Sequence, residues 1–342
     1  MVMRLAVAAL LVVSLAAQES KFGIESRLVL VPVTVTDSKG RPVDGLEASD
    51  FLLYDNGVRQ EAVVDTIATG VAPIALIVAV QSSGISAPVL AKVQKIGAML
   101  QPLITGERGC AALVAFDERT RWLQECTDDP DLLVRAFDNL RPGEYKSAHM
   151  LDAVHEAVEH LLKRPNFRRV LLLISESRDR GSERTLEAVL ITTQAAGVTV
   201  YAATYSATKT AFTTRTSEKD RPPESKIPRD SRTGPITPQG RVITPTPEQQ
   251  LDILGGIGEL VRLGKVKDTE VLTSKTGGAP FPFTRQKGLE GAIEKLSAEL
   301  HTQYVLSFTP EAPASGYHRL EVRINRGDQF RIRARPGYWS SE

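Results

Sequence analysis

The chain has 342 residues, a length that allows two or three domains with a sizeable core. Apolar residues make up 42% and charged residues 24%, and 42 Lys and Arg stand against 41 Asp and Glu, which excludes a disordered tail protein and a strongly basic nucleic-acid-binding protein. Two cysteines and five histidines, without paired Cys/His spacing, exclude a disulfide framework and leave little room for a structural zinc site.

The N-terminus has the pattern of a secretory signal peptide, which we place at residues 1–17. A short positive start precedes the apolar run 5–15, and small residues follow before polar Gln18. The alternative is a buried helix. No cysteine follows the run to carry a lipid, and no later stretch reaches about 18 uninterrupted apolar residues, so we expect no membrane span. The mature protein is therefore expected to be exported, to a periplasm or outside the cell.

The next segment, residues 24–68, has an all-β pattern. Apolar residues at 28–36 run into the turn cluster 37–40, and a second apolar run at 51–54 is followed by Asp55-Asn56-Gly57. An Asn-Gly pair between two apolar runs is a strong hairpin signal.

From residue 73 the pattern changes to alternating strands and helices. The continuous apolar run 74–80 is typical of a parallel strand covered on both faces. Further strands are expected at 170–174 and 198–203. Apolar spacings of three and four predict helices at 89–103, 151–161 and 289–300. Further helices are expected at 129–140 and at 183–196, where Gly197 ends the helix. This rhythm predicts a doubly wound α/β domain with a mostly parallel sheet, over residues 72–309.

Export gives the two cysteines a predicted role. Residues 110–116 and 120–126 have the patterns of two strands, and a turn at 117–119 would pair them antiparallel. Counting outward from the turn places Cys110 opposite Cys126, within reach of a disulfide bond. Two unpaired buried thiols are the alternative.

Two further segments complete the chain. Residues 207–250 are rich in Pro, Ser, Thr and charges without hydrophobic periodicity, and we expect a flexible insertion there, followed by a helix at 251–263. Residues 304–308 are expected to form the last core strand of the α/β domain. Residues 310–340 alternate again and predict a C-terminal β hairpin. Because a lone hairpin is marginal in water, we expect it to pack with the N-terminal β segment.

Several stretches together resemble bacterial von Willebrand factor type A-related domain proteins of the kind abundant in acidobacteria. They are residues 33–37 with 45–51, the strand end at 81–84, Thr276-Gly277-Gly278, residues 303–308, and Arg335-Pro336-Gly337-Tyr338-Trp339. The resemblance covers nearly the whole mature chain. It implies a type A domain, with a central, mostly parallel sheet flanked by helices, of a kind that usually serves protein binding and not catalysis.

The family's ligand site is a metal-ion-dependent adhesion site at the carboxyl ends of the strands. It uses Asp-x-Ser-x-Ser after the first strand, a threonine on a second loop and a later aspartate. In this sequence the resemblance aligns those positions with the following candidate interaction residues: Gln81, Ser83, Ile85, Ala148 and Glu176.

The aligned positions predict a degenerate site. Ser83 and Glu176 keep an oxygen ligand, whereas Ile85 and Ala148 have none in their side chains, so a divalent cation would be poorly held. We therefore expect no metal or cofactor; if a Mg or Ca ion binds, its ligands are Ser83 and Glu176. A shifted loop could recruit compensating oxygen or nitrogen ligands from Ser86, Ser147, His149 or Asp179. The simpler alternative makes Ser83 a helix cap and Glu176 a solvated loop acid.

Enzymatic motifs do not fit. Residues 81–85 lack the first glycine of a serine nucleophile elbow, no phosphate loop is present, and His155 and His160 lack the H-E-x-x-H spacing. The tripeptide at 326–328 matches an integrin-recognition sequence, for which a turn is a sufficient account.

The sequence thus predicts an exported, non-catalytic module that binds a protein partner through the carboxyl-edge loops, does not bind nucleic acid and has no membrane span. One alternative is a metal-dependent adhesion protein with a modified site. Another is a secreted hydrolase with an unrecognised site.

Overall fold

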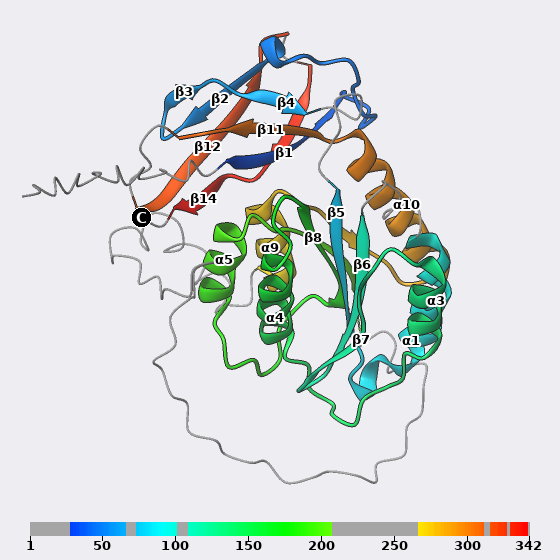
Figure 1. The fold of residues 1–342 in the computed structure, drawn as a ribbon. Coiled ribbons are helices and arrows are strands. Elements are labelled where there is room, and N and C mark those ends of the chain that lie inside the picture. The colour runs from blue at the N-terminus through cyan, green and yellow to red at the C-terminus, as the bar shows by residue number, and fades with distance from the viewer. Residues whose placement is uncertain are drawn as a thin grey trace, which may run out of the picture.

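The computed structural model describes residues 28–65, 73–100, 109–206, 266–310, 315–326 and 329–340. The predicted signal peptide 1–17, the insertion at 207–250, the expected helix 251–263 and part of the tripeptide at 326–328 lie outside these residues. The described chain forms an α/β unit and a smaller β unit that stacks on one end of its sheet (Figure 1). No described helix is long and apolar enough to cross a membrane.

The α/β unit is built on a mostly parallel sheet. Its described strands, in the order β10-β9-β8-β5-β6-β7, pair in parallel except at the β6–β7 edge. They are β5 (Ile74–Gln81), β6 (Cys110–Phe116), β7 (Thr120–Thr127), β8 (Arg168–Glu176), β9 (Thr199–Tyr205) and β10 (Pro280–Pro282). Nearly every residue of β5, β6 and β8 is buried, as expected for strands covered on both faces.

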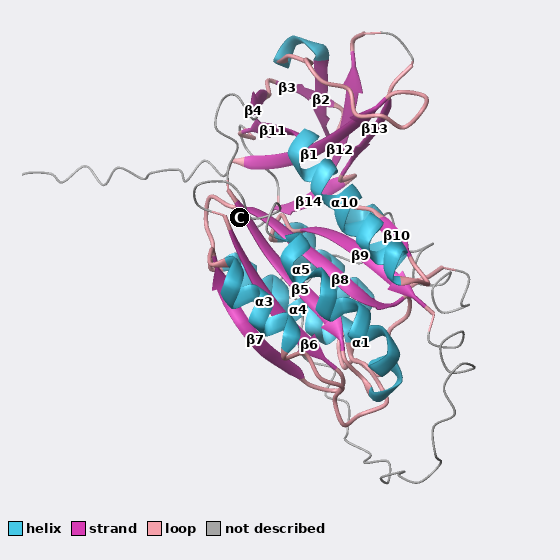
Figure 2. Ribbon diagram, turned by 90° about the vertical axis from the view of Figure 1, so that its right-hand side faces the viewer, coloured by secondary structure: helices cyan, strands magenta, loops and turns pink. Residues whose placement is uncertain are grey.

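Helices cover both faces of this sheet, which confirms the predicted doubly wound architecture (Figure 2). One face packs against α1 (Ala87–Val93), the 3-10 helix η4 (Gln94–Leu100), α3 (Pro130–Asp138) and α10 (Gln286–Thr302). The other face packs against α4 (Met150–Leu162), α5 (Leu186–Ala195) and α9 (Asp268–Thr276). The ends follow local chemistry: the Asp129 side chain accepts N–H bonds at the start of α3, and Gly277, with φ +85°, ends α9.

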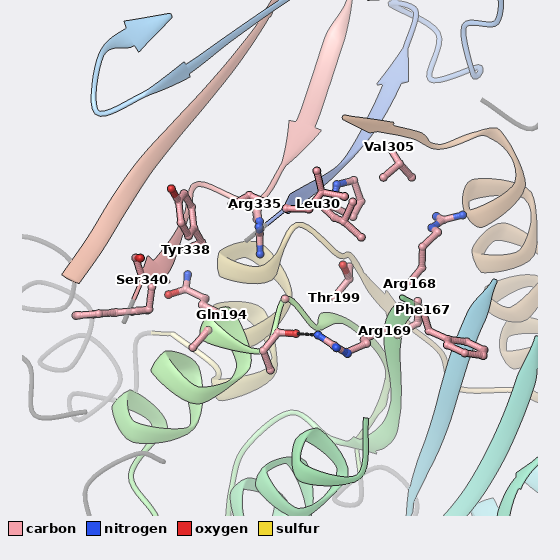
Figure 3. A pocket seen from close by; sticks show the side chains of 18 of the residues that line it. Leu30, Phe167, Arg168, Arg169, Gln194, Thr199, Val305, Arg335, Tyr338 and Ser340 are labelled. Carbon is pink, nitrogen blue, oxygen red and sulfur yellow. Dashed lines mark hydrogen bonds between the residues drawn. The ribbon is translucent and has the colours of Figure 1, made fainter. Parts of the chain in front are cut away.

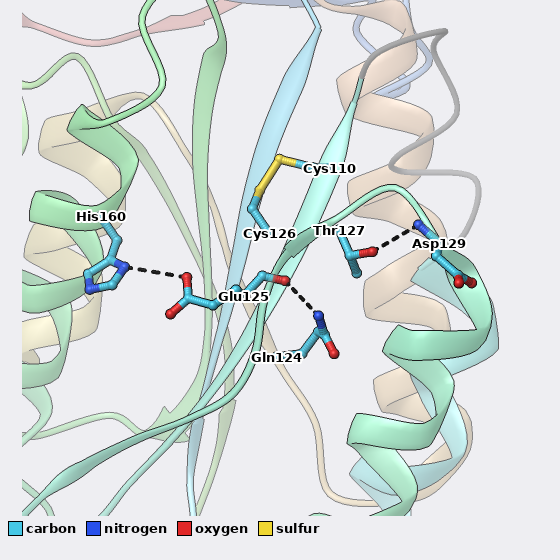
Figure 4. Close-up of a disulfide and its surroundings, with 7 residues drawn as sticks. All are labelled: Cys110, Gln124, Glu125, Cys126, Thr127, Asp129 and His160. Atoms are coloured by element: carbon cyan, nitrogen blue, oxygen red, sulfur yellow. Dashed lines mark hydrogen bonds and ion pairs between the residues drawn. A yellow bond between two sulfur atoms is a disulfide. The ribbon is translucent and has the colours of Figure 1, made fainter.

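The predicted disulfide between Cys110 and Cys126 is present and links β6 to β7, with a Cα–Cα distance of 5.3 Å (Figure 4). The register differs from the simple count. Pairing begins as predicted at Phe116 and Thr120, but two irregularities shift it, so that Ala111 lies opposite Thr127. The cysteines are therefore diagonal neighbours and not directly opposed; the extra residues of the bulged β7 produce the shift.

The β unit contains two sheets with one shared core. The first has the order β13-β1-β11-β4 and the second β14-β12-β2-β3 among the described strands. Their bounds are β1 (Val29–Thr36), β2 (Phe51–Asp55), β3 (Val58–Gln60), β4 (Val63–Asp65), β11 (Tyr304–Phe308), β12 (Gly316–Ile324), β13 (Arg331–Ala334) and β14 (Gly337–Ser340). Strand β1 alternates buried and half-buried residues, and its buried valines face Phe51, Leu53 and Tyr304 in the core.

Two expected boundaries differ in the structure. Residues 304–308 were expected in the α/β sheet, but β11 pairs antiparallel with β1 and β4 in the β unit. The α/β unit therefore ends with α10, before residue 304 rather than at 309. The C-terminal segment is also not a simple hairpin, because β12 pairs with β2 and β14 while β13 pairs with β1 in the other sheet.

Candidate interaction site

The residues predicted from the resemblance gather at the carboxyl edge of the parallel sheet. Gln81 ends β5 and Glu176 ends β8, and these neighbouring strands run in parallel, so their ends meet. Ser83 and Ile85 follow β5, in and beside the 3-10 helix η3 (Gly84–Ser86), and Ala148 lies just before α4. Gln81, Ser83 and Glu176 are brought into direct contact.

The Gln81 amide joins these three residues. Its Nε2 atom donates to Ser83 Oγ at 3.0 Å and to Glu176 Oε2 at 3.4 Å, and its Oε1 atom accepts the backbone N–H of Glu176 at 2.9 Å. Because the Glu176 N–H needs an acceptor, the amide oxygen must face it and the two amide hydrogens must face the oxygens. The side chain is 2% exposed, so this orientation is fixed in the interior.

The hydrogen bonds continue from Ser83 along the carboxyl ends of the strands, which we call the mouth of the sheet. Ser83 Oγ lies 3.1 Å from Ser86 Oγ, and the Tyr205 hydroxyl, at the end of β9, donates to Ser86 Oγ at 2.8 Å. Burial raises the pKa of Tyr205, so that its hydroxyl keeps the proton it donates. We call the set Gln81, Ser83, Ser86, Glu176 and Tyr205 the mouth network.

The simpler alternative for Ser83 and Glu176 is wrong. Ser83 occupies the N-cap position of η3, yet its side chain makes no capping hydrogen bond. Glu176 is 7% exposed and therefore not a solvated acid. Its Oε1 atom lies 3.3 Å from Arg180 Nη2, and its Oε2 atom accepts from Gln81, as a buried carboxylate requires.

Ile85 and Ala148 contribute no polar side-chain atom to the mouth network. Ile85 is half-buried, and Ala148 is buried in the core beneath α4. Ala148 acts through its backbone, because its carbonyl oxygen accepts the Arg180 N–H at 3.2 Å. This bond holds Arg180 where its guanidinium reaches Glu176.

Of the four compensating ligands considered, Ser86 alone belongs to the mouth network. The other three bond elsewhere: Ser147 donates to Glu118, His149 Nδ1 lies 3.6 Å from Asp152 Oδ2, and Asp179 Oδ1 accepts the Leu151 N–H at 3.1 Å. These contacts fix the start of α4 and the loop after β8.

A second buried polar group beside the mouth was not identified from the sequence. Asp117 is fully buried and pairs with Arg121 Nη1 at 3.0 Å, while Arg121 Nη2 donates to Ser82 Oγ at 2.8 Å. Gly143 closes over this pair, and a Cβ atom there would stand 1.8 Å from Asp117 Oδ2. Neither this group nor Arg180 and Tyr205 belongs to a local motif, so no sequence signal identified them.

A divalent cation does not fit this set of donors. Hard cations need several oxygen ligands and negative charge. The side-chain oxygens at the aligned positions, Ser83 Oγ and Glu176 Oε2, both face the Gln81 nitrogen instead. Within the described ranges no group of three or more His, Cys, Asp or Glu residues could hold a metal ion.

Comparisons with known proteins give likenesses of fold. No protein-family model matches the sequence, and no curated protein matches it. An aerotolerance-related membrane protein from Bacteroides fragilis is similar over 66% of this chain and 99% of its own, with 12% identity and a TM-score of 0.41. Proximal thread matrix protein 1 from the mussel byssus, with a zinc-occupied MIDAS motif, is similar over 72% and 49%, with 13% identity and a TM-score of 0.42.

The von Willebrand factor A (VWA) domain of SpRpn10 is similar over 40% of this chain and 79% of its own, with 15% identity and a TM-score of 0.33. At these identities and TM-scores the likenesses do not assign the chain to a family, and membership of an acidobacterial-type family stays a prediction. The architecture itself follows from the strand order: a doubly wound α/β unit with one antiparallel edge strand, joined to a β unit from both ends of the described chain.

Proposed function

We propose that the protein is a non-catalytic interaction module of von Willebrand factor A type that binds a protein partner through the carboxyl-edge loops without a bridging cation. The observation that supports this most is the position of Gln81 Nε2, between the two oxygens that a cation would need. The amide supplies two hydrogen-bond donors, which link the end of β5 to Ser83 and to the end of β8. The adhesion site is, in this proposal, degenerate.

We propose a non-catalytic role because of the groups that surround the Ser83 hydroxyl. A serine nucleophile needs an adjacent base, usually oriented by a third group. Ser83 Oγ contacts Ser86 Oγ and the Gln81 amide, neither of which is a base at neutral pH. The mouth network thus stabilises a surface and does not activate a group.

The loops around the mouth supply a contact surface. Exposed residues of both charge signs rim it, among them Glu118, Arg119 and Lys146. The Arg119 guanidinium lies 5.5 Å from the centre of the Tyr145 ring, which presents an amphipathic pair to a partner. A polar rim with an aromatic or arginine anchor is typical of protein interfaces.

Export is part of the proposal. The Cys110–Cys126 bond supports it, because disulfides persist in oxidising compartments such as a periplasm or the extracellular space. The signal-peptide pattern at 1–17 points the same way. We propose a periplasmic or secreted location.

Capture of envelope proteins on the purified chain tests the proposal. We expect capture to be equal in Mg²⁺ and in EDTA, and to be lost in the double variant Arg119→Glu/Lys146→Glu. The matched control is Arg59→Glu, which reverses an exposed charge on the β unit. Capture that EDTA abolishes would instead support the metal-dependent adhesion alternative, and equal capture by both charge variants would contradict the proposed surface.

A further inference from the structure

A cavity of about 160 Å³ lies between the two units, at the opposite edge of the parallel sheet from the mouth network (Figure 3). Its floor includes Arg168 and Thr199, which begin β8 and β9, and its roof includes residues of β1, β11 and β14. The volume exceeds the share of several water molecules, at about 30 Å³ each in the liquid. Because the cavity lies where β8 and β9 begin and the mouth network lies where they end, the two sites are separate.

The lining of this cavity carries positive charge alone. Three arginines line it, Arg168, Arg169 and Arg335, and no aspartate or glutamate is among the described lining residues. Arg168 and Arg335 are 6% and 7% exposed, so both are more than nine-tenths buried. Burial lowers the pKa of Arg335 to about 10 and also lowers the pKa of Arg168 and of Arg169. Buried cations normally have a paired anion.

Several donors in the lining have no acceptor. Arg168 Nη1 and Nη2 donate to Leu300 O at 3.1 Å and Gln303 Oε1 at 2.7 Å, but the Nε atoms of Arg168 and Arg335 have no hydrogen-bond partner in the described structure. The indole Nε1 of Trp339, which also lines the cavity, has none either.

The Arg335 side chain points from the β unit into the cavity, between Gln194 and Thr199 (Figure 3). Because it points into the cavity, Arg335 is the charged group best placed to meet a ligand there. Its guanidinium fork matches the geometry of carboxylate and phosphate.

The helix ends at the cavity do not balance the charge. Gly197, just after α5, lies against Arg335 Nη1, and Gly277, at the end of α9, lies against the Arg335 backbone. A helix C-terminus carries about half a negative elementary charge, so two of them offset about one of three guanidinium charges. Water can accept the free N–H groups, but it is neutral and leaves the charge in place.

We propose that this cavity binds a compact oxyanion, held by Arg335 and the indole N–H of Trp339 at the junction of the two units. Inorganic phosphate and small carboxylates share the required chemistry. Bound there, the anion contacts elements of both units and stabilises their junction by mass action, since it binds only the folded chain.

Calorimetric titration of the purified chain with phosphate, sulfate or acetate, at ionic strength matched with sodium chloride, tests the proposal and distinguishes the anions. We expect saturable binding of at least one. Arg335→Met should raise its dissociation constant at least tenfold, because a charged hydrogen-bond donor is removed. The matched control, Arg59→Met, removes an exposed arginine and should leave the constant unchanged.

A second variant covers the case in which Arg335→Met does not fold. Trp339→Phe keeps a ring in place and removes only the indole N–H, and it should raise the dissociation constant severalfold. Saturable binding that neither variant weakens would overturn the proposal. The absence of saturable binding by all three anions would overturn it as well, and would leave a cavity solvated by water alone.

Discussion

Gln81 Nε2 lies 3.0 Å from Ser83 Oγ and 3.4 Å from Glu176 Oε2, in a part of the molecule that admits almost no solvent. We propose that one neutral amide binds both oxygens, which a divalent cation would otherwise bind. If Gln81 stands at the aspartate position of the adhesion motif, as we propose, the amide also removes a negative charge, which lowers the need for a cation at this edge.

The first prediction concerns this amide. Gln81→Met keeps the length of the side chain but removes the donor to Ser83 Oγ and Glu176 Oε2 and the acceptor of the buried Glu176 N–H. Because an unsatisfied buried polar group costs about 1–3 kcal/mol, we expect a loss of about 3 kcal/mol in the free energy of unfolding, measured by urea denaturation. Gln124→Met, at a partly exposed position on β7, is the control. A loss below about 1 kcal/mol would contradict the role of the amide.

The residues of the site could be predicted only in part. The resemblance pointed to Gln81, Ser83 and Glu176. These residues meet in the structure because neighbouring parallel strands end at the same edge of the sheet. Tyr205 and Arg180 could not be identified, because their roles depend on contacts between segments that are distant in sequence. Burial of Glu176 was likewise hidden, since its partners include Gln81, which lies 95 residues earlier along the chain.

At the scale of elements, the β6–β7 edge depends on the disulfide. The bond closes a loop between residues 16 apart, and a loop of about this size contributes about 3 kcal/mol by restricting the unfolded chain. We predict that Cys110→Ala/Cys126→Ala lowers the free energy of unfolding by about that amount. A reductant should have the same effect on the wild type and none on the double variant. An unchanged urea midpoint in the variant would contradict this prediction.

Helix α4 should give the stability a pH dependence. Burial, followed by the charge of Arg184, lowers the pKa of His155, which is 3% exposed. In the unfolded chain the pKa is about 6.5, so the unfolded state binds more protons as the pH falls. Stability should therefore decrease below about pH 6.5.

His155→Gln removes this titration and should flatten the decrease in stability between about pH 7 and pH 5. His301→Gln, at an exposed position near the end of α10, should not. Urea midpoints measured across this range give both slopes. The same slope in His155→Gln as in the wild type would contradict the assignment.

Periodicity predicted the α/β elements well and the position of one strand wrongly. Amphipathic spacing identified α4 and α10, because each buries one face against the sheet. The short apolar run of β11, by contrast, suits a parallel strand and a sandwich strand equally. Its partners β1 and β4 lie more than 200 residues earlier along the chain, and no local pattern records that pairing.

At the scale of the molecule, the α/β unit is inserted between the two halves of the β unit. Strands β1 to β4 precede it, and β11 to β14 follow it. The core of the β unit therefore closes only when both ends of the chain are present, with Leu320 and Tyr338 from the C-terminal part packed against Phe51 and Leu53.

We predict that a chain ending at residue 310 loses the β unit but keeps the α/β unit. Without β12 to β14, the apolar side chains of β1 and β2 lose their cover, and residues 28–65 should become sensitive to protease. The described residues between β5 and α10, with the disulfide, should resist the same digestion. Equal resistance of both segments would show that the two ends do not form one cooperative unit.

The central claim is that an amide has replaced the cation at the mouth of the sheet, and Mn²⁺ titration tests it most directly. The wild type should show no saturable binding, whereas the variant Gln81→Asp/Ile85→Ser/Ala148→Thr, which restores three oxygen ligands, should bind Mn²⁺. Saturable Mn²⁺ binding by the wild type that is lost in Glu176→Gln would contradict the account.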